Sequence, residues 1–279
     1  MDYDFGDYED IGEEEWLESW PRDVRIDEAR DELVKFFNEN DKKVYYLKQL
    51  EVFFEKKPFK FFHWITAKAV NELIEEGDLG EEEVPLGKNT RVKFVFNKKF
   101  RDHKMPIRKS TEVIREYSNP IIAMACGRQA EVLFFNALTN KGFLSHGQEV
   151  NEYGGKKWTE TEHDLDFIIE KDNITYGCEV KNRWDYIKRD ELTIKLKTCE
   201  FLGKKPLFIM RNSPNSYNWE IIQNGGYAMI FETQIYPFGQ KELVEKIREV
   251  LDLPVDCPRA IPEGIIERFI KWYKKNITV

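Results

Sequence analysis

The chain has 279 residues, 41% hydrophobic and 14% aromatic, which is enough for a sizeable core and excludes a chain that is disordered throughout. Its formal net charge is −8 at pH 7, which at first argues against nucleic acid as a partner. No apolar run reaches the length of a membrane span and the first residues are acidic, so we expect neither a membrane partner nor a secretory signal.

Residues 1–26 are predicted to form an acidic tail. The first 30 residues hold 12 acidic and 3 basic residues, so the rest of the chain is nearly neutral, with 40 basic against 39 acidic residues. Such a tail is either disordered or covers a basic surface when nucleic acid is absent. Trp16, Leu17 and Trp20 lie at helical spacing, which suggests that part of the tail docks on another surface.

From residue 27 onwards, apolar residues recur with helical spacing in three segments: DEARDELVKFFNEN, KKVYYLKQLEVFFEKK and WITAKAVNELIEEGDL. In the third segment, Thr66 is the predicted N-cap and Gly77 the predicted end. Two short extended runs, 84–86 and 91–96, then flank a Gly-Lys-Asn turn. Three helices followed by a hairpin resemble a winged helix-turn-helix domain, which we assign to residues 27–104.

The expected wing of this domain is basic. Segment 88–109 carries nine Lys and Arg residues and a single acid, a pattern that phosphate-binding surfaces share with ordinary solvated surfaces. The third helix presents three glutamates beside Lys68 and Asn71, which does not suit a major groove. We therefore expect DNA contacts on the wing, from Lys88, Arg91, Lys93, Lys98, Lys99 and Arg101. Winged helices also dock proteins, so a protein partner is an alternative of nearly equal weight.

The second half, residues 105–279, alternates between helices and short strands. Residues 105–127 are predicted to be a helical connector, followed by the helix RQAEVLFFNALTNKG and an extended stretch. After these come two apolar strands, LDFIIEKDNITYGCEVKNR. The helix DELTIKLKTCEFLG and the strand KPLFIMR follow, and then the helix YNWEIIQNG and the strand GYAMIFE. Two helices, KELVEKIREVL and GIIERFIKWYKKN, come last. This alternation predicts an α/β fold with a central sheet.

The two apolar strands are predicted to form a hairpin. Asp172 and Asn173 tolerate the left-handed backbone that a two-residue turn needs. A turn at this pair places Asp166 opposite Glu179 on the neighbouring strand.

Because side chains alternate across a strand, the hairpin has two faces. One is expected to be wholly apolar: Leu165, Phe167, Ile169, Tyr176, Cys178 and Val180. The other is expected to be charged, with room left by Gly177: Asp164, Asp166, Glu170, Glu179 and Lys181. Two opposed carboxylates lie about 5 Å apart and repel each other unless a cation sits between them. We therefore predict a Mg²⁺ or Mn²⁺ site formed by Asp166, Glu179 and the backbone carbonyl of Val180.

This arrangement suits phosphodiester hydrolysis. A bound cation polarises the phosphate and lowers the pKa of its water, while Lys181 would orient that water or stabilise charge on the phosphate. Asp166 followed by Glu179-Val180-Lys181 at the end of an apolar strand resembles the motif of the PD-(D/E)XK nuclease superfamily, which includes restriction endonucleases and archaeal Holliday-junction resolvases.

The resemblance covers roughly residues 120–250 and implies a restriction-endonuclease-like mixed sheet, flanked by helices, with the hairpin strands central. It also implies a catalytic glutamate on the preceding helix, a position that Glu131 matches. Leu165 stands where the family often has proline, which leaves Asp164 as either a rival ligand or a salt-bridge partner for Lys181.

The function implied is a metal-dependent DNA endonuclease, in restriction or in repair and recombination of branched or damaged DNA, and a homodimer because two strands must be cut. The alternative is a non-catalytic DNA-binding or regulatory protein with a nuclease-like fold. Asn182 and Arg183 follow the motif and are candidate contacts to DNA, whereas Lys195 and Lys197 are expected to be merely solvated.

The four cysteines form no CxxC pair, so we expect a cytoplasmic, reducing location.

Overall fold

The computed structural model describes residues 23–87 and 90–277. Almost all of the predicted acidic tail, with Trp16, Leu17 and Trp20, lies outside these residues, and so does Lys88. The chain divides into two compact units. Unit 1 consists of Met1–Glu83 and Val92–His103, and unit 2 consists of Val84–Arg91 and Lys104–Val279.

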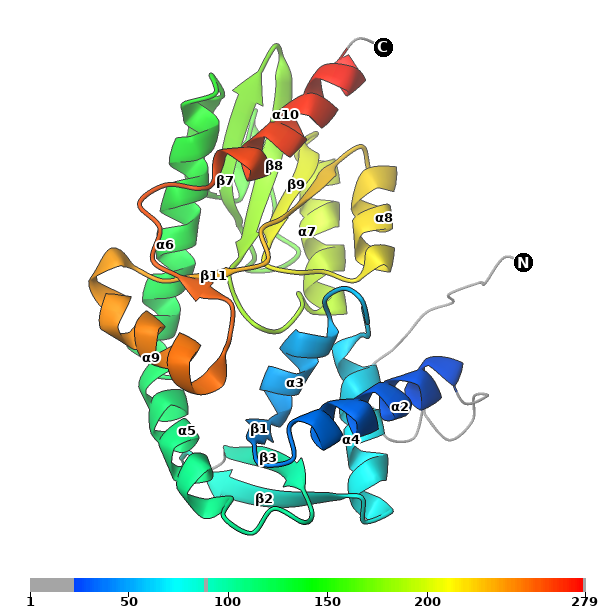
Figure 1. The fold of residues 1–279 in the computed structure, drawn as a ribbon. Helices are drawn as coiled ribbons and strands as arrows, with labels where there is room; N and C mark the ends of the chain where they lie inside the picture. The colour runs from blue at the N-terminus through cyan, green and yellow to red at the C-terminus, as the bar shows by residue number, and fades with distance from the viewer. Residues whose placement is uncertain (1–22, 88–89, 278–279) are drawn as a thin grey trace. The chain divides into compact units, whose positions relative to one another are not determined.

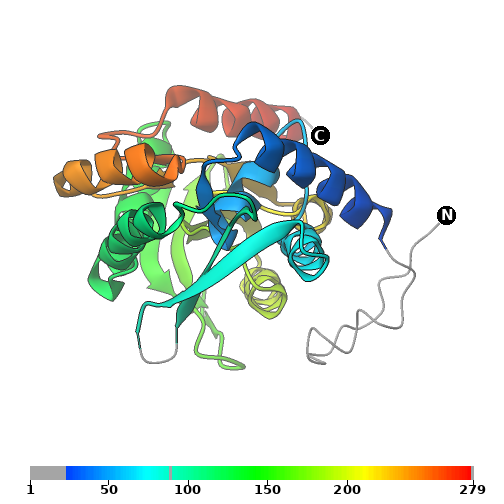
Figure 2. The same ribbon diagram turned by 60° about the horizontal axis from the view of Figure 1, so that its bottom comes forward.

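Unit 1 combines helices with a small sheet. Its elements are α2 (Val24–Glu39), β1 (Val44–Tyr46), α3 (Leu47–Phe54), α4 (His63–Glu75), β2 (Leu79–Pro85) and β3 (Arg91–Asn97), the outer ends of β2 and β3 being assigned to unit 2. The strand order is β1-β3-β2, with β1 antiparallel to β3. Figures 1 and 2 both show α2 beside α4. Their apolar faces meet α3 and the sheet in one core, which includes Leu33, Leu50, Leu73 and Val95.

Two boundaries in unit 1 differ from the predicted ones. Helix α2 begins at Val24, because the side chain of Asp23 caps it by accepting a hydrogen bond from the Arg25 N–H, so the predicted tail ends too late. Thr66 is not an N-cap, since α4 already begins at His63 and Thr66 is fully buried within it. Gly77 follows the helix with φ +84°, as its predicted role as a C-terminal stop requires.

The second predicted helix also begins too early. Residues Val44–Tyr46 form β1, which pairs with Phe94–Phe96 of β3, and α3 starts only at Leu47. One β-branched and two aromatic residues favour a strand when a partner strand is available. The partner lies about fifty residues further along the chain, which is why helical periodicity alone misassigned this segment.

Unit 2 is an α/β unit around a mixed five-stranded sheet of order β10-β9-β8-β7-β4. Strands β8, β9 and β10 are parallel to one another, while β7 is antiparallel to both of its neighbours. The strands are β4 (Leu144–Val150), β7 (Leu165–Lys171), β8 (Ile174–Lys181), β9 (Lys205–Met210) and β10 (Tyr227–Ile230). The predicted α/β class, the mixed sheet and the central place of the hairpin strand β8 are confirmed.

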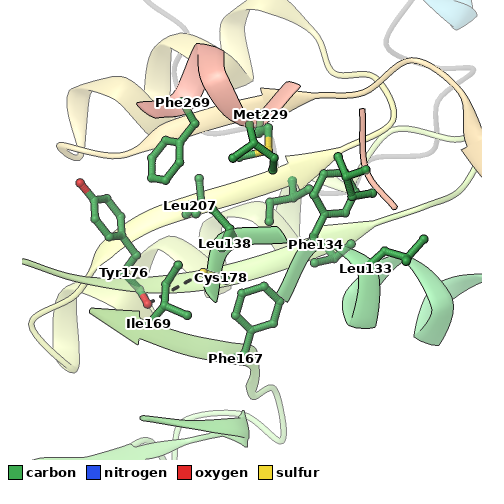
Figure 3. Packing of buried hydrophobic residues seen from close by; sticks show 14 of the residues in the cluster. Leu133, Phe134, Leu138, Phe167, Ile169, Tyr176, Cys178, Leu207, Met229 and Phe269 are labelled. Carbon is green, nitrogen blue, oxygen red and sulfur yellow. Dashed lines mark hydrogen bonds between the residues drawn. The ribbon is translucent and has the colours of Figure 1, made fainter. Parts of the chain in front are cut away.

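Helices cover both faces of this sheet (Figure 1). The covering helices are α6 (Pro120–Thr139), α7 (Arg189–Phe201), α8 (Asn215–Gln223) and α10 (Glu263–Ile277), while α5 (Lys104–Tyr117) and α9 (Lys241–Leu251) pack against each other. On one face, α6 and α10 pack on β7–β10, and Figure 3 shows Phe134 and Leu138 of α6 and Phe269 of α10 around the hairpin residues. On the other face, α7 and α8 enclose a smaller core that includes Leu192 and Ile221.

Short strands complete unit 2. A small hairpin of β5 (Glu152–Tyr153) and β6 (Lys156–Lys157) turns at Gly154 and Gly155, both with positive φ. A parallel pair of β11 (Gln234–Ile235) and β12 (Val255–Asp256) was not predicted. Two-residue strands are too short to show an alternating pattern, so they become visible only through their pairing.

The predicted connector, 105–127, is interrupted at residues 118–119, and its last residues belong to the same helix as the segment that follows it. Helix α6 starts at Pro120, where Asn119 caps it by accepting from the Ile121 N–H, and it runs through Gly127 to Thr139. Among the described residues, α6 alone has the length and composition that would allow it to cross a membrane, with a mean hydropathy of 1.3. The prediction that no apolar run is long enough was therefore wrong on these criteria, although core helices of folded domains also meet them and α6 contributes Phe134 to the sheet core.

Candidate active site

The β7–β8 hairpin has the predicted register. Strand pairs run from Lys171–Ile174 to Phe167–Cys178, and both turn residues, Asp172 and Asn173, have left-handed backbones with φ 51° and 63°. The paired ladder stops one residue before Asp166 and Glu179. Beyond that point, β8 continues alongside β9 instead. The hairpin therefore opens where the two predicted metal ligands lie.

The C-terminal helix holds the turn of this hairpin. The Tyr273 hydroxyl of α10 lies 3.0 Å from the Lys171 carbonyl oxygen and 2.9 Å from Asp172 Oδ2. The residue that closes the hairpin is thus fixed by a helix 101 positions away in sequence.

The apolar face of the hairpin is largely as predicted. Phe167, Ile169, Tyr176 and Cys178 point into the main core of unit 2 (Figure 3), and Val180 lies in the same core. Leu165 is the exception, because it packs on the opposite side of the sheet in a cluster with Ile168, Cys199 and Leu202.

The expected room at Gly177 is filled. A Cβ at this position would lie 2.7 Å from Leu165 Cδ1 and 2.8 Å from Cys199 Sγ. The open space next to the acids was therefore wrongly predicted. Glycine is needed because β8 passes close to α7 and to Leu165 at this point.

Asp166 contacts the backbone of the opposite strand. Its Oδ2 accepts a hydrogen bond of 2.6 Å from the Val180 N–H, and the role of the Val180 carbonyl as a metal ligand stays a prediction. Burial and the negative charge of Glu179 raise the pKa of Asp166 from 3.8 to about 7, against the opposing effects of the Val180 amide, Lys181 and Lys195. This carboxyl group is therefore unusually ready to hold a proton when no cation is near.

Glu179 is 1% exposed and is surrounded by positive charge. Its Oε1 lies 2.5 Å from Lys181 Nζ, and its Oε2 lies 2.6 Å from Lys195 Nζ. The two ammonium groups therefore compensate the negative charge of both buried oxygens. Lys181 also contacts Glu191 Oε1 at 2.7 Å. Although burial alone would lower the pKa of Lys181, these two carboxylates raise it above its ordinary value.

Lys195 is the main site residue that the sequence analysis missed. It was expected to be solvated, but it is 4% exposed, and its ammonium group also contacts the Asp164 carbonyl oxygen. The signal was present in the sequence, since Lys195 lies on the buried stripe of α7 with Leu192, Leu196 and Cys199. A lysine at such a position needs a buried partner. Lys197, by contrast, is exposed.

Glu131 on α6 interacts electrostatically with the residues of the site. It is half-buried, and its pKa is raised by burial and by Glu179, against the opposing effects of Lys181 and Arg128. The structure thus brings all four predicted catalytic residues into one electrostatic environment: Glu131, Asp166, Glu179 and Lys181.

Asp164 does not take the predicted position opposite Lys181. It precedes the first residue of β7, and the described ion pairs of Lys181 are with Glu179 and Glu191. The hairpin opens before this position, which removes the register on which that pairing depended.

The two residues after the motif differ from each other. Asn182 is buried, and its side chain ties β8 to the Cys126 carbonyl oxygen at 2.9 Å and to the Ile235 amide at 2.8 Å. It therefore cannot contact DNA as the sequence analysis considered. Arg183 is exposed and close enough to Glu191 to help lower its pKa, and its predicted role at the DNA backbone stays a prediction.

The predicted DNA-binding residues of the wing differ in their exposure and in their pairing within the protein. Lys93 contacts Glu81 Oε2 at 3.1 Å and Asn71 Oδ1 at 3.0 Å, so its charge is largely compensated. The other described members are exposed: Arg91, Lys98, Lys99 and Arg101. In the third helix of unit 1, Glu72 and Glu76 both pair with Arg30 of α2, which reduces the negative charge that argued against this helix.

No family model matches the chain, and neither a curated protein nor a solved structure matches it. The residues of the site do fit a divalent cation. Asp166 and Glu179 are neighbouring carboxylates whose charges repel each other, and Asp166 keeps Oδ1 outside its contact with Val180. Such oxygens are the preferred ligands of Mg²⁺ and Mn²⁺.

Proposed function

We propose that the chain is a metal-dependent nuclease that hydrolyses phosphodiester bonds in DNA. The observation that carries the proposal is the placement of Asp166 and Glu179 at the open end of the β7–β8 hairpin, with Lys181 two residues later on the same strand. Mutual repulsion helps to raise the pKa of Asp166, and a cation bound to both acids would remove that repulsion.

The charge balance supports one divalent cation. Four carboxylates and two ammonium groups meet at this site: Glu131, Asp166, Glu179, Glu191, Lys181 and Lys195. With every group ionised the formal charge of these six is two negative units, which favours a cation, and Arg128 and Arg183 partly offset the outer carboxylates Glu131 and Glu191. Buried charges are costly unless they are compensated.

Each residue then has a defined task. Asp166 and Glu179 would hold the ion, and a bound ion would polarise the scissile phosphate and lower the pKa of its water. Lys181, whose raised pKa keeps it positively charged, stabilises negative charge on the phosphate. Glu131 adds a third carboxylate, from α6, whose charge favours a bound cation.

The order of elements around the site also supports the resemblance to PD-(D/E)XK nucleases. Helix α6 with Glu131 precedes β4 and the β7–β8 hairpin, and α7 and β9 follow. For unit 1 we propose a winged-helix-like module, supported by its element order and its β1-β3-β2 sheet. We place the protein in the cytoplasm, where four free cysteines fit reducing conditions.

One observation favours a second candidate, a non-catalytic DNA-binding or regulatory protein. Lysine ammonium groups occupy both oxygens of Glu179, so Glu179 is compensated without a cation. Such a protein would bind DNA through a nuclease-like fold and would not cleave it.

A cleavage assay separates the two candidates. The protein is incubated with Mg²⁺ or Mn²⁺ and supercoiled, linear, single-stranded or branched DNA, with RNA alongside. Asp166→Asn keeps an acceptor for the Val180 amide but removes the charge, and we expect it to lower cleavage at least about a hundredfold. Glu200→Gln, at an exposed carboxylate on α7, should cleave normally. Binding without cleavage by the wild type would favour the second candidate.

A further inference from the structure

Four charged side chains form a chain of contacts from the interior of unit 2 outward. Lys195 contacts Glu179, Glu179 contacts Lys181, and Lys181 contacts Glu191. The side chains of Lys195 and Glu179 are 5% and 1% exposed, whereas those of Lys181 and Glu191 are 13% and 17% exposed. The outer two therefore have more freedom to rearrange than the inner two.

Because both oxygens of Glu179 are in contact with an ammonium group, direct binding of a cation to Glu179 must displace a lysine. Displacing Lys195 would leave a buried ammonium group with only the Asp164 carbonyl oxygen among its described contacts. Displacing Lys181 leaves it paired with Glu191, which already lies 2.7 Å away. An unpaired buried charge costs far more than a retained ion pair, so Lys181 is the lysine that moves.

We infer that Glu191 is a positioning residue that holds Lys181 when Glu179 takes up a cation, while Lys195 stays as the permanent counter-ion of Glu179. The inference rests on the proposed metal-dependent function. Glu191 lies in the first turn of α7 and Lys195 one turn later, so a single helix supplies both the alternative partner of one lysine and the other lysine itself.

Calorimetric titration of the full chain with Mn²⁺ alone tests the role of Glu191 without any cleavage. Glu191→Gln removes the alternative partner, so Lys181 competes for Glu179 and the Mn²⁺ affinity should fall about tenfold. Glu191→Asp keeps the charge but shortens the side chain, and we expect a similar loss. Glu200→Gln on the same helix is the control and should bind Mn²⁺ as the wild type does.

The decisive comparison uses a background without Lys181. Lys181→Met removes the competing ammonium group, so Mn²⁺ should bind more tightly than in the wild type. Adding Glu191→Gln to this variant should then change the affinity less than twofold, because Glu191 acts only through Lys181. An equal loss from Glu191→Gln in both backgrounds would show a general electrostatic effect and overturn the inference.

Lys195 is tested through stability. Without a cation, Lys195→Met leaves Glu179 with Lys181 alone, and it should lower the melting temperature well below that of Lys197→Met, its exposed control on α7. Equal melting temperatures for these two variants would contradict the role given to Lys195. If the wild type binds no Mn²⁺, the proposed function fails together with this inference. If it binds Mn²⁺ and Glu191→Gln has no effect, only the inference fails.

Discussion

Asp166 and Glu179 show how a protein interior changes the chemistry of a single carboxyl group. Both are acids beside the same two lysines, but only Glu179 contacts both ammonium groups directly. Asp166 instead accepts one backbone hydrogen bond and has a pKa raised to about 7. The protonation state of Asp166 therefore depends on pH near neutrality and on a bound cation.

The raised pKa predicts how the stability of the metal-free protein depends on pH. Between about pH 4 and about pH 7 the folded state keeps a proton on Asp166 that the unfolded chain has released. The folded state then binds more protons, so the contribution of Asp166 to stability falls as pH rises through this window. We expect Asp166→Asn to lose this dependence, so that it gains stability relative to the wild type towards neutral pH.

Urea unfolding in a chelating buffer at several pH values measures this difference. Parallel stability curves for the two proteins would contradict it. Addition of Mg²⁺ should reverse the trend in the wild type, because a cation favours the ionised carboxylate.

Only some of the residues of the site could be predicted from the sequence. Asp166, Glu179 and Lys181 could be grouped because a two-residue turn and the alternation of strand side chains fix their relation locally. Lys195 and Glu191 lie on the next helix, and their relation to Glu179 depends on how α7 packs on the sheet. That packing is a long-range property which helical periodicity does not contain, although the buried-stripe position of Lys195 was a usable signal.

At the scale of elements, the β7–β8 hairpin is set by its turn. Asn173 has φ 63°, a conformation that costs a β-branched residue about 1–2 kcal/mol. We expect Asn173→Val to lower the free energy of unfolding by about that amount, as measured by urea titration. Asn173→Gly should leave it unchanged or slightly higher, because glycine adopts this conformation without steric cost. Similar losses for both substitutions would show that the side chain of Asn173, and not its backbone, matters.

Elements with strong local signals were predicted well, and those that depend on distant partners were not. Helix α9 runs from Lys241 to Leu251 as predicted, because its apolar stripe is regular. Strand β1 was taken as helix, because three residues carry no period of their own and β3 decides their conformation. The break between α5 and α6 follows from the Asn119–Pro120 pair, a capping signal that the sequence did contain.

At the scale of the whole molecule, the proposed function predicts that the exposed basic residues of the wing contribute to DNA binding. Lys98, Lys99 and Arg101 are exposed, whereas Lys93 is compensated by Glu81. We expect a triple Ala variant of the exposed residues to bind duplex DNA more weakly and to reduce the slope of log affinity against log salt by about one unit per lost phosphate contact.

Lys93→Ala is the matched control and should leave that slope nearly unchanged, because its charge is already paired within the protein. Fluorescence anisotropy over a range of salt concentrations measures both variants. A triple variant with the wild-type slope would assign DNA binding to other residues and would favour a protein-docking role for the wing.

The contact of Tyr273 with the hairpin turn has a consequence for folding during translation. Translation delivers β7 and β8 about a hundred residues before α10, so the turn at Asp172 waits for its partner while the rest of the chain leaves the ribosome. The acids and lysines of the site are therefore all synthesised before the helix that secures their hairpin. The hairpin that carries these residues would therefore be secured only after α10 has been synthesised.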